Sequence, residues 1–535
     1  MSSSRIDRVF ERRLSALINS GEPHVLQGGR KGVEKESLRV TPKGDLARTA
    51  HPKALGSALT NEHITTDFSE ALIELVTPAF TQSWELLQYL LDLHQFVYRH
   101  LDDELLWATS MPCAIESDAA IPLAQFGPSN VGRMKTIYRH GLGMRYGRMM
   151  QAISGVHFNY SFPKGFWEAF AVVRESRESG QQFISSSYFD LLRNYRRYGW
   201  IVLYLFGVSP VLCKSFLRGR DAGLRELTPG TVYEPYATSL RMSDLGYRNR
   251  NQAGLSVSVN SLEEYVRDLN HAIYTPHSPY QAMGVKDTDA PGEPGVFGYR
   301  QLNANILQIE NEYYSFIRPK RVAQSGERPT KALQRAGVEY VEVRALDVSA
   351  FDPVGVNQNK LRFLEAFLAL CVLKDSPLIS SSEEGPLDQN HVTVARRGRE
   401  PGLTLARDGR NVSMRGWARE LLDSMTGICE VLDHGDPLRP YTNALAVQAA
   451  KLDDVALTPS ARLLNELEST GESFFEQALR MSTFHKEYFL ELYAPNQERL
   501  GEFAAAAEES LEAQKRLDTG QREPFEAYLS RYFAK

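Results

Sequence analysis

The stretch that most constrains the fold lies near the amino terminus, where residues 31–40 read Lys-Gly-Val-Glu-Lys-Glu-Ser-Leu-Arg-Val. In a β-strand successive side chains point to opposite faces of the sheet, so Glu34 and Glu36 share one face while Lys35 and Arg39 share the other. Two neighbouring carboxylates repel each other unless a cation lies between them. We therefore expect a sheet with one cation-binding face, the cation being an arginine, a lysine or a metal ion.

Three further strand-like runs carry ionisable or polar side chains where a buried strand is normally apolar. They are residues 71–77 with Glu74, residues 153–162 with His157 and Asn159, and residues 338–346 with Glu342 and Arg344. Each alone fits a strand acid paired with an arginine, or a hydrogen-bonded core histidine. Together they predict one polar face built from distant parts of the chain. Carboxylate oxygens are the ligands that magnesium prefers, and magnesium also binds nucleotide phosphates.

Helical and strand-like periodicities follow one another irregularly along the 535 residues. Helical spacing dominates residues 5–20, 82–105, 165–222, 358–374 and most of the chain from about 415 onward. Further strand-like runs lie at residues 254–259 and 303–310. Because strands and helices do not alternate regularly, the order predicts an α+β fold with a mainly antiparallel sheet.

Three segments lead to more specific predictions. Residues 200–213 are apolar, but they are too short to span a bilayer and are interrupted by Gly207 and Pro210. We expect a core helix there. Residues 376–411 are rich in Ser, Gly, Pro and charge, which is typical of a mobile loop, and residues 285–297 have a similar composition.

Charge, cysteine usage and missing motifs exclude several classes of protein. The net charge of −5 argues against a nucleic-acid or anionic-membrane partner, and the basic cluster at 192–198 is typical of a solvated helix face. The four cysteines lie far apart, which predicts neither a zinc site nor a disulfide framework. No apolar signal segment precedes the first helix, so we expect a cytoplasmic protein. No Gly-x-x-x-x-Gly-Lys-[Ser/Thr] motif occurs, which excludes a P-loop.

Seven longer motifs resemble, in the same order, those of bacterial glutamate–cysteine ligases, also called γ-glutamylcysteine synthetases. They occupy residues 32–40, 63–74, 123–130, 154–159, 237–247, 308–314 and 339–347, the last reading Glu-Tyr-Val-Glu-Val-Arg-Ala-Leu-Asp. The likeness runs from about residue 5 to beyond residue 440. The family's fold is similar to that of glutamine synthetase and creatine kinase, with ATP at one end of a funnel and the amino acids at the other.

The resemblance implies a fold, a reaction and a set of partners. We expect a curved, mainly antiparallel sheet that forms a funnel-shaped active site surrounded by helices. Residues 1–440 would form the catalytic ligase domain, and residues 441–535 a helical region packed on it. ATP, L-glutamate and L-cysteine would give γ-glutamylcysteine, ADP and phosphate through γ-glutamyl phosphate, the first step of glutathione biosynthesis. The metal would be Mg²⁺, with Mn²⁺ as an alternative, and the partners small molecules only, with no nucleic acid, no membrane and a monomeric protein.

The resemblance also assigns roles to individual residues. The metal-site candidates are Glu34, Glu36, Asp67, Glu74, His157 and Glu342, with Glu342 expected to bridge two ions. The expected substrate-binding residues are Tyr138, Gln151, Asn159, Arg241, Tyr247, Tyr314 and Arg344. Those expected to act in catalysis are Arg344, Glu342 and Arg241. A planar guanidinium such as that of Arg344 suits a transferring phosphoryl group or the glutamyl carboxylate.

Two alternatives stay open on the sequence alone. A related carboxylate–amine ligase would share the metal carboxylates but would accept a different amine. A non-catalytic paralogue would bind glutamate or a nucleotide without turnover. The complete set of acids argues against the second alternative, because a binding protein has no need of every carboxylate ligand.

Overall fold

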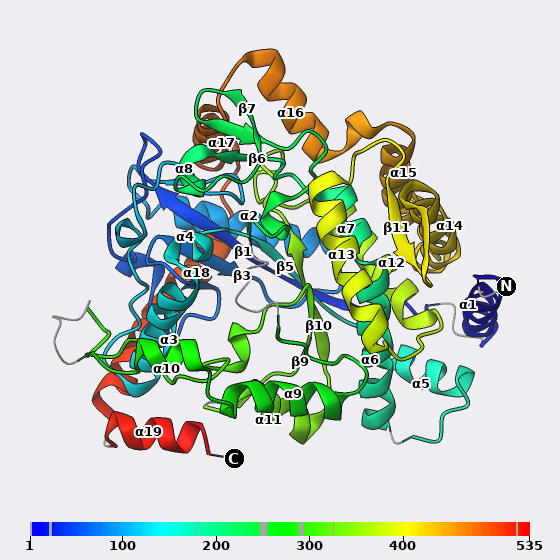
Figure 1. Ribbon diagram of the computed structural model, residues 1–535, viewed down its shortest axis with the longest axis horizontal. Coiled ribbons are helices and arrows are strands. Elements are labelled where there is room, and N and C mark those ends of the chain that lie inside the picture. Colours follow the sequence, from blue (N-terminus) through cyan, green and yellow to red (C-terminus); the bar gives the residue numbers. More distant parts are fainter. Residues whose placement is uncertain are drawn as a thin grey trace.

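The centre of the molecule is one antiparallel sheet, seen crossing the middle of Figure 1. The computed structural model describes residues 3–20, 24–178, 180–246, 254–287, 294–324, 326–520 and 523–534. The strands of the sheet are β1 (Arg30–Val40), β2 (Ile64–Thr66), β3 (Leu72–Val76), β4 (Leu105–Leu106), β5 (Val156–Ser161), β9 (Ile317–Lys320) and β10 (Tyr340–Leu346). Their order is β2-β3-β1-β5-β10-β9, with β4 beside β1, and all pairs are antiparallel. The α+β fold with an antiparallel sheet is confirmed.

The helices surround this sheet. They are α1 (Ser3–Ile18), α2 (Ser83–Tyr98), α3 (Asn130–Tyr146), α4 (Arg148–Gln151), α5 (Lys164–Val173), α6 (Gly180–Tyr198), α7 (Trp200–Phe206), α8 (Lys214–Leu217), α9 (Leu262–Tyr274), α10 (Ser278–Met283), α11 (Pro329–Ala336), α12 (Gln358–Leu373), α13 (Ser381–Arg397), α14 (Met414–Leu432), α15 (Pro440–Asp453), α16 (Pro459–Thr470), α17 (Phe474–Glu487), α18 (Gln497–Gly520) and α19 (Phe525–Tyr532). Two short one-turn elements, η3 (Leu240–Met242) and η5 (Glu310–Glu312), lie near the sheet in sequence segments that carry candidate site residues. Among the described residues, no helix combines the length and apolar character needed to cross a membrane.

Strand β1 has the two-faced character expected from its sequence. Glu34 and Glu36 lie on the face shared with the polar residues of β5 and β10. On the other face Lys31, Lys35 and Arg39 are all buried. Lys31 pairs with Glu365 of α12 at 2.6 Å, which neutralises a charge that would otherwise be isolated in the core.

Several predicted elements are wrong. The described residues of 254–259 and 303–310 form no strand, since their extended backbone makes only an isolated bridge at Asn305. The apolar run 200–213 is not one helix, because α7 stops before Gly207 and the chain then enters strand β6 (Val211–Cys213). A glycine followed by a proline three residues later ends the helical path there. In 285–297, residues 288–293 lie outside the described part of the chain.

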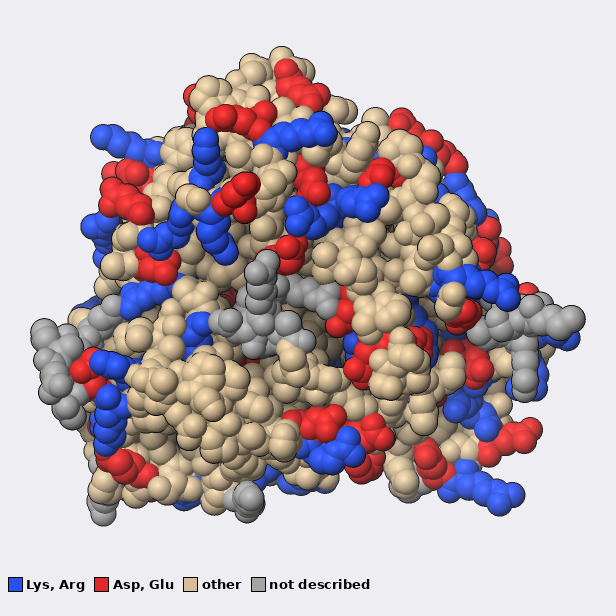
Figure 2. Space-filling view, viewed as in Figure 1, with Lys and Arg blue, Asp and Glu red and all other residues tan. Residues whose placement is uncertain are grey.

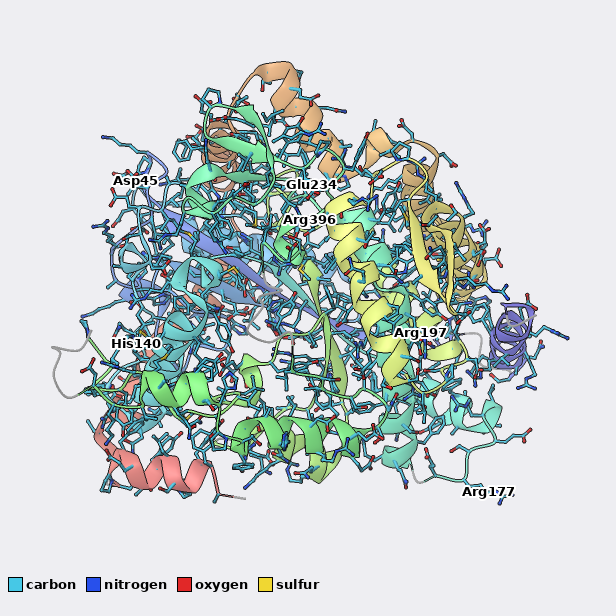
Figure 3. All side chains as sticks on the ribbon, in the orientation of Figure 1. Asp45, His140, Arg177, Arg197, Glu234 and Arg396 are labelled. Carbon is cyan, nitrogen blue, oxygen red and sulfur yellow. A yellow bond between two sulfur atoms is a disulfide. The ribbon has the colours of Figure 1, made fainter. Side chains whose placement is uncertain are left out.

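The segment 376–411 is also not a loop, because it contains helix α13 and a hairpin of β11 (Thr404–Arg407) and β12 (Arg410–Ser413). Charged side chains anchor α13 to its surroundings: Arg197 donates to Glu383 at 2.7 Å, and Arg396 donates to Glu234 at 2.9 Å. Arg197, Glu234 and Arg396 are labelled in Figure 3. Arg197 is buried, so the basic cluster at 192–198 is not a solvated face.

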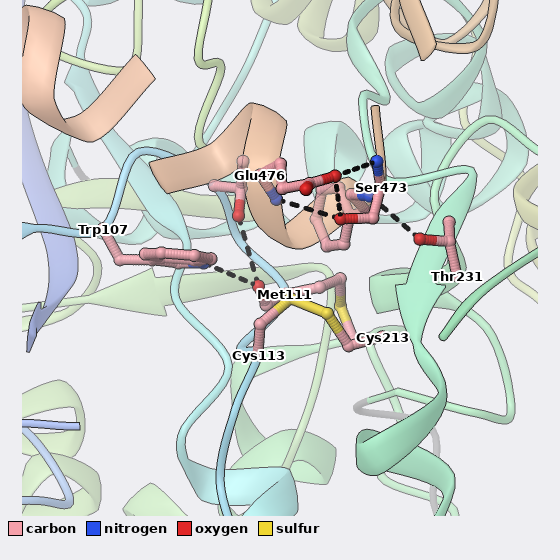
Figure 4. Close-up of a disulfide and its surroundings, with 9 residues drawn as sticks. Trp107, Met111, Cys113, Cys213, Thr231, Ser473 and Glu476 are labelled. Atoms are coloured by element: carbon pink, nitrogen blue, oxygen red, sulfur yellow. Dashed lines mark hydrogen bonds between the residues drawn. A yellow bond between two sulfur atoms is a disulfide. The ribbon is translucent and has the colours of Figure 1, made fainter. Parts of the chain in front are cut away.

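The cysteines contradict the prediction of no disulfide. Cys113, in the loop after β4, is joined to Cys213 at the end of β6, and the two lie 100 residues apart in the sequence (Figure 4). β6 pairs with β8 (Thr231–Tyr233), which in turn pairs with β7 (Arg225–Thr228). The remaining two, Cys371 and Cys429, are free and buried. A bond across such a long separation leaves no local spacing signal.

The last helices pack on the sheet-bearing part of the chain. α18 contacts α2, α17 contacts β4, and α15 contacts α12. Tyr441 of α15 donates to Glu365 at 2.6 Å, so the helical end reaches the Lys31 ion pair beneath β1. On the face shown in Figure 2, basic and acidic side chains are interspersed.

Candidate active site

Three strands bring acids around a histidine that a fourth strand carries, all on one face of the sheet. His157 of β5 lies opposite Glu34 of β1, and its Nδ1 is 3.0 Å from a Glu34 oxygen. The same nitrogen is 3.8 Å from Glu342 of β10, and Nε2 is 3.9 Å from Glu36. Glu74 of β3 lies directly across from Glu36. The period of two within each strand and the register between strands together produce this cluster.

The cluster has the chemistry of a divalent-metal site. Two groups have ligand atoms within 4.8 Å of one another: Glu34, His157 and Glu342, and Glu36, Glu74 and His157. Glu342 Oε2 is buried and has no hydrogen-bond partner among the described residues. A buried carboxylate oxygen without a donor fits a cation ligand, because a lone buried charge is otherwise unfavourable.

The carboxyl groups of the cluster have opposed pKa shifts. Burial, with the nearby charges of Glu34 and Asp67, raises the pKa of Glu74 well above its usual value. Burial also raises the pKa of Glu36, although His157 opposes it. For Glu342, burial raises the pKa, but the cations of Lys320 and Arg344 outweigh it and hold the pKa well below its usual value. Like charges held this close favour either protonation or a bound cation.

Two side-chain cations contact the acid at the centre of this face. Arg344 Nη1 and Lys320 Nζ each lie 3.1 Å from Glu342 Oε1. Arg344 is two residues along β10 from Glu342, and Lys320 ends β9. For Arg344, burial lowers the pKa, but Glu342, Glu36 and Glu34 outweigh it and raise the pKa above its usual value. A fixed guanidinium therefore stands beside the candidate metal ligands.

Arg241 lies behind the same acids. It belongs to η3 and is 1% exposed, and its Nη2 donates to the carbonyl oxygen of Arg344 at 3.3 Å. Gly155, just before β5, lies against the Arg241 guanidinium, because a Cβ on Gly155 would be 2.0 Å from Arg241 Nη2. The amide of Gly155 also donates to Glu36 at 2.6 Å. One backbone segment thus separates Arg241 from a candidate metal ligand.

Comparisons with known proteins identify the family. A model of the glutamate-cysteine ligase family matches residues 14–394. The chain belongs to the glutamate–cysteine ligase family. The resemblance found in the sequence motifs is confirmed, and the protein is a ligase.

The ligase relatives match along their whole length. The glutamate–cysteine ligase of Alcanivorax borkumensis is 48% identical over 527 residues, which cover 98% of this chain and 99% of that protein. The one from Pseudomonas putida is 47% identical, with 98% of each chain covered. The crystal structure of a glutamate–cysteine ligase from Francisella tularensis, in complex with AMP, has a TM-score of 0.88 at 36% identity and covers 95% of this chain and 98% of that one. A bifunctional glutathione synthetase from Pasteurella multocida, at 21% identity and a TM-score of 0.69, shares the fold.

Some of the predicted substrate residues of this ligase lie beside the acid cluster. Asn159 donates to Glu34 at 2.8 Å. The Tyr314 hydroxyl lies 3.4 Å from the sulfur of Met242, next to Arg241 in the chain. Tyr138 is buried on α3, and burial raises the pKa of its phenol. Of the predicted substrate residues, Asn159 and Arg344 contact acids of the cluster directly.

Other predicted residues are not brought into the cluster. Asp67 lies outside both acid groups and pairs with Arg139 of α3 at 3.8 Å. Gln151 ends α4, half-buried, and Tyr247 lies outside the described residues. The roles of the whole predicted set stay predictions.

Three neighbours of the ligase site were missed by the sequence reasoning. Arg139 follows the predicted Tyr138, Gly155 precedes His157 in the motif at 154–159, and Asp347 closes the motif at 339–347. Gly155 and Asp347 lie inside the motifs and Arg139 directly follows a predicted residue, and these positions were the available signal. Their contacts depend on strand register and on loops distant in sequence, which no local pattern reveals.

Proposed function

We propose that this chain joins the γ-carboxylate of L-glutamate to the amine of L-cysteine at the expense of ATP, giving γ-glutamylcysteine, ADP and phosphate. The observation that carries the proposal is the group of buried and half-buried acids around His157 on the sheet of a glutamate–cysteine ligase family member. This reaction is the first step of glutathione biosynthesis. A carboxylate does not react with an amine at neutral pH, so it must first become an acyl phosphate.

The acids around His157 would hold the metal ions. Magnesium, or manganese in its place, supplies positive charge that offsets the phosphate charge repelling the incoming carboxylate. Glu34 and Glu342 would serve one position and Glu36 and Glu74 another, with His157 between them. Asp67 would become a metal ligand only if its carboxylate broke the ion pair with Arg139. A neutral imidazole has a single nitrogen lone pair, so His157 would bind an ion at one of these positions while its other nitrogen keeps its proton.

ATP would lie at the β9–β10 end of the sheet. A cavity of about 190 Å³ there is lined by residues that include Arg318, Lys320 and Tyr340, on the same face as Glu342. The AMP complex of the Francisella tularensis relative supports a nucleotide site in this fold. Lys320 and Arg344 would then orient the transferring phosphoryl group, as fixed cations do in phosphoryl transfer.

The two amino acids would meet on the opposite side of the cluster. Arg241 and Asn159 would hold glutamate, with Tyr138 and Gln151 nearby, and Arg344 would face its reacting carboxylate. The amine would lie near Tyr314, which lines a cavity of about 800 Å³, and Tyr247. The amine nitrogen forms the new bond to the acyl carbon, the carbon–oxygen bond to phosphate breaks, and the amine loses its proton.

We also propose that residues 1–440 form the catalytic domain and that residues 441–535 support it. Tyr441 bonds to Glu365 of α12, and α18 packs against α2. A cytoplasmic, monomeric enzyme with only small-molecule partners fits the dispersed surface charge.

The test is phosphate release from ATP with glutamate alone, cysteine alone and both, together with mass spectrometry of the product. We expect sustained release only with both amino acids and magnesium. Equal turnover with unrelated primary amines would favour a ligase with another acceptor. Nucleotide or glutamate binding without any turnover would favour a non-catalytic paralogue.

A further inference from the structure

A second buried carboxylate stands behind Arg241, away from the acid cluster. Asp347 follows the last residue of β10, and its side chain is 0% exposed. Its Oδ2 accepts from the amide of Val208 and the hydroxyl of Ser209, each at 2.8 Å. Its Oδ1 accepts from the Ser239 hydroxyl at 2.9 Å and lies 3.6 Å from Arg241 Nη1. A carboxylate with this many donors has a fixed orientation.

The position of Asp347 depends on an irregularity in β10. The pairing of β10 with β5 changes register between Val343 and Leu346, so β10 carries one extra residue there. Such a bulge re-aims the side chains that follow it. The bulge contains Arg344, whose carbonyl oxygen accepts from Arg241 Nη2 at 3.3 Å. The bulge thus places the Asp347 carboxylate and the Arg344 carbonyl oxygen beside the guanidinium of Arg241.

Arg241 is confined on its other sides as well. The sulfur of Met242 accepts from Nη1 at 3.1 Å, and the backbone of Gly155 lies against Nη2. Beyond Gly155 is Glu36, whose carboxylate attracts the same guanidinium. Two carboxylates therefore compete for Arg241: Asp347 behind it, and Glu36 in the acid cluster. The side on which the guanidinium rests decides whether it is available to a substrate anion or neutralises a candidate metal ligand.

We propose that Asp347 is a positioning residue that, with Ser209 and Ser239, holds the Arg241 guanidinium back from Glu36 and oriented toward the glutamate substrate. This inference rests on the proposed function. Asp347 touches neither substrate nor metal. It acts through Arg241, so its loss weakens glutamate binding more than it slows the chemical steps.

The experiment uses Asp347→Asn, which keeps the shape and removes the charge. We expect the glutamate KM to rise about tenfold or more, with kcat lowered less and the KM values for cysteine and ATP within roughly twofold of wild type. Calorimetric titration of the magnesium-loaded protein with glutamate should show a matching loss of affinity. In an Arg241→Lys background, adding Asp347→Asn should raise the glutamate KM by less than about threefold, because coupled residues are not additive.

The matched control is Asp433→Asn, another buried carboxylate, which accepts from the Tyr441 amide and from the amide and hydroxyl of Thr442 between α14 and α15. It should lower the melting temperature without raising the glutamate KM. A folded Asp347→Asn protein whose glutamate KM and calorimetric affinity equal those of wild type would overturn the inference, as would full additivity with Arg241→Lys. If Asp347→Asn does not fold, Ser239→Ala replaces it, and an unchanged glutamate KM in that variant would also overturn the inference.

The calorimetric arm separates this inference from the proposed function. If the wild-type chain ligates glutamate to no amine, the proposed function fails. Glutamate binding that still depends on Asp347 would then support the positioning role by itself. Glutamate binding that does not depend on Asp347, or no glutamate binding at all, would overturn it.

Discussion

At the scale of single residues, the two oxygens of Glu342 have different surroundings. Lys320 and Arg344 both contact the same oxygen, while the second oxygen is buried and has no donor among the described residues. The two oxygens therefore face different partners. An entering cation has one oxygen at its disposal and competes with two side-chain cations for the other, so the roles of Glu342 and Arg344 are separable by experiment.

Substitutions at Glu342 and Arg344 should differ in kind. Glu342→Gln removes a candidate ligand, so we expect the half-saturating magnesium concentration to rise about tenfold or more. Arg344→Lys keeps the charge but loses the planar fork, and should lower turnover on the order of 100-fold at a nearly unchanged magnesium requirement. Magnesium titrations of initial rate measure both. Identical shifts in half-saturating magnesium would show that the two residues merely pair with each other.

Gly155→Ala should displace Arg241. The added methyl would be 2.0 Å from Arg241 Nη2, and the guanidinium is confined by Asp347 and the Arg344 carbonyl. We expect the glutamate KM to rise roughly tenfold with a loss of stability below about 2 kcal/mol. Gly165→Ala is the control, because a Cβ at that helix position meets nothing within 4 Å. Equal glutamate KM values in the two variants would contradict the confined geometry.

At the scale of elements, β1 joins two polar systems through one backbone. Its acids meet β3, β5 and β10 on one face, and on the other its Lys31 pairs with Glu365 of α12, which also accepts from Tyr441 of α15. Glu365 is the shared acceptor beneath the sheet, where it receives Lys31 at 2.6 Å and the Tyr441 hydroxyl at 2.6 Å. The second system therefore supports the strand that carries the candidate ligands.

Glu365→Gln should be strongly destabilising. The change leaves Lys31 buried without an anion, so we expect the free energy of unfolding to fall by about 3–5 kcal/mol. Denaturant unfolding followed by circular dichroism measures the loss. Glu168→Gln breaks the exposed pair with Lys164, at 3.7 Å, and should change stability by less than about 0.5 kcal/mol. Similar losses of stability in the two variants would mean that the buried ion pair contributes no more to stability than the exposed one.

Local alternation explains what the sequence could predict. The acids of β1, β3 and β10 and the histidine of β5 lie on one face because each strand has its own period of two, visible without any partner. The features that depend on contacts with distant segments of the chain could not be predicted from local alternation. Helix α13 contains Gly385 and Pro386 and looks like a loop, but Arg197 and Glu234 hold it in place. The Cys113–Cys213 bond and the contacts of Asp347 likewise join segments about 100 residues apart or more.

At the scale of the whole molecule, the carboxyl-terminal helices close around the core that supports the sheet. α15 places Lys451 against α7, where its ammonium donates to the carbonyl oxygen of Leu205 at 2.7 Å and to Gln448 at 2.7 Å. Its charged surroundings are Lys360, Asp352 and Arg462. Burial, with Lys360 as a smaller contributor, lowers the pKa of Lys451 from its usual 10.5 to about 7. The docking of this region is therefore sensitive to pH.

The sign of that dependence follows from the lowered pKa. Between pH 7 and 10.5 the unfolded chain holds more protons at Lys451 than the folded protein does, so this group makes stability rise with pH in that window. Lys451→Met lacks the effect, so its stability relative to wild type should fall by roughly 3.5 kcal/mol between pH 7 and pH 10. Unfolding midpoints at several pH values measure it. Exposed Lys164, changed to Met, should show no such trend.

The two-faced strand β1 also limits how the length of this chain can vary. Inserting or deleting one residue between Val33 and Glu36 would exchange the faces, sending carboxylates into the core and Lys35 toward Glu74 of β3 and His157 of β5. A two-residue insertion would preserve the phase. Family members should therefore tolerate side-chain substitutions in this strand far more readily than an insertion or deletion of an odd number of residues. The number of residues in β1 keeps the acids on one face and the buried cations on the other.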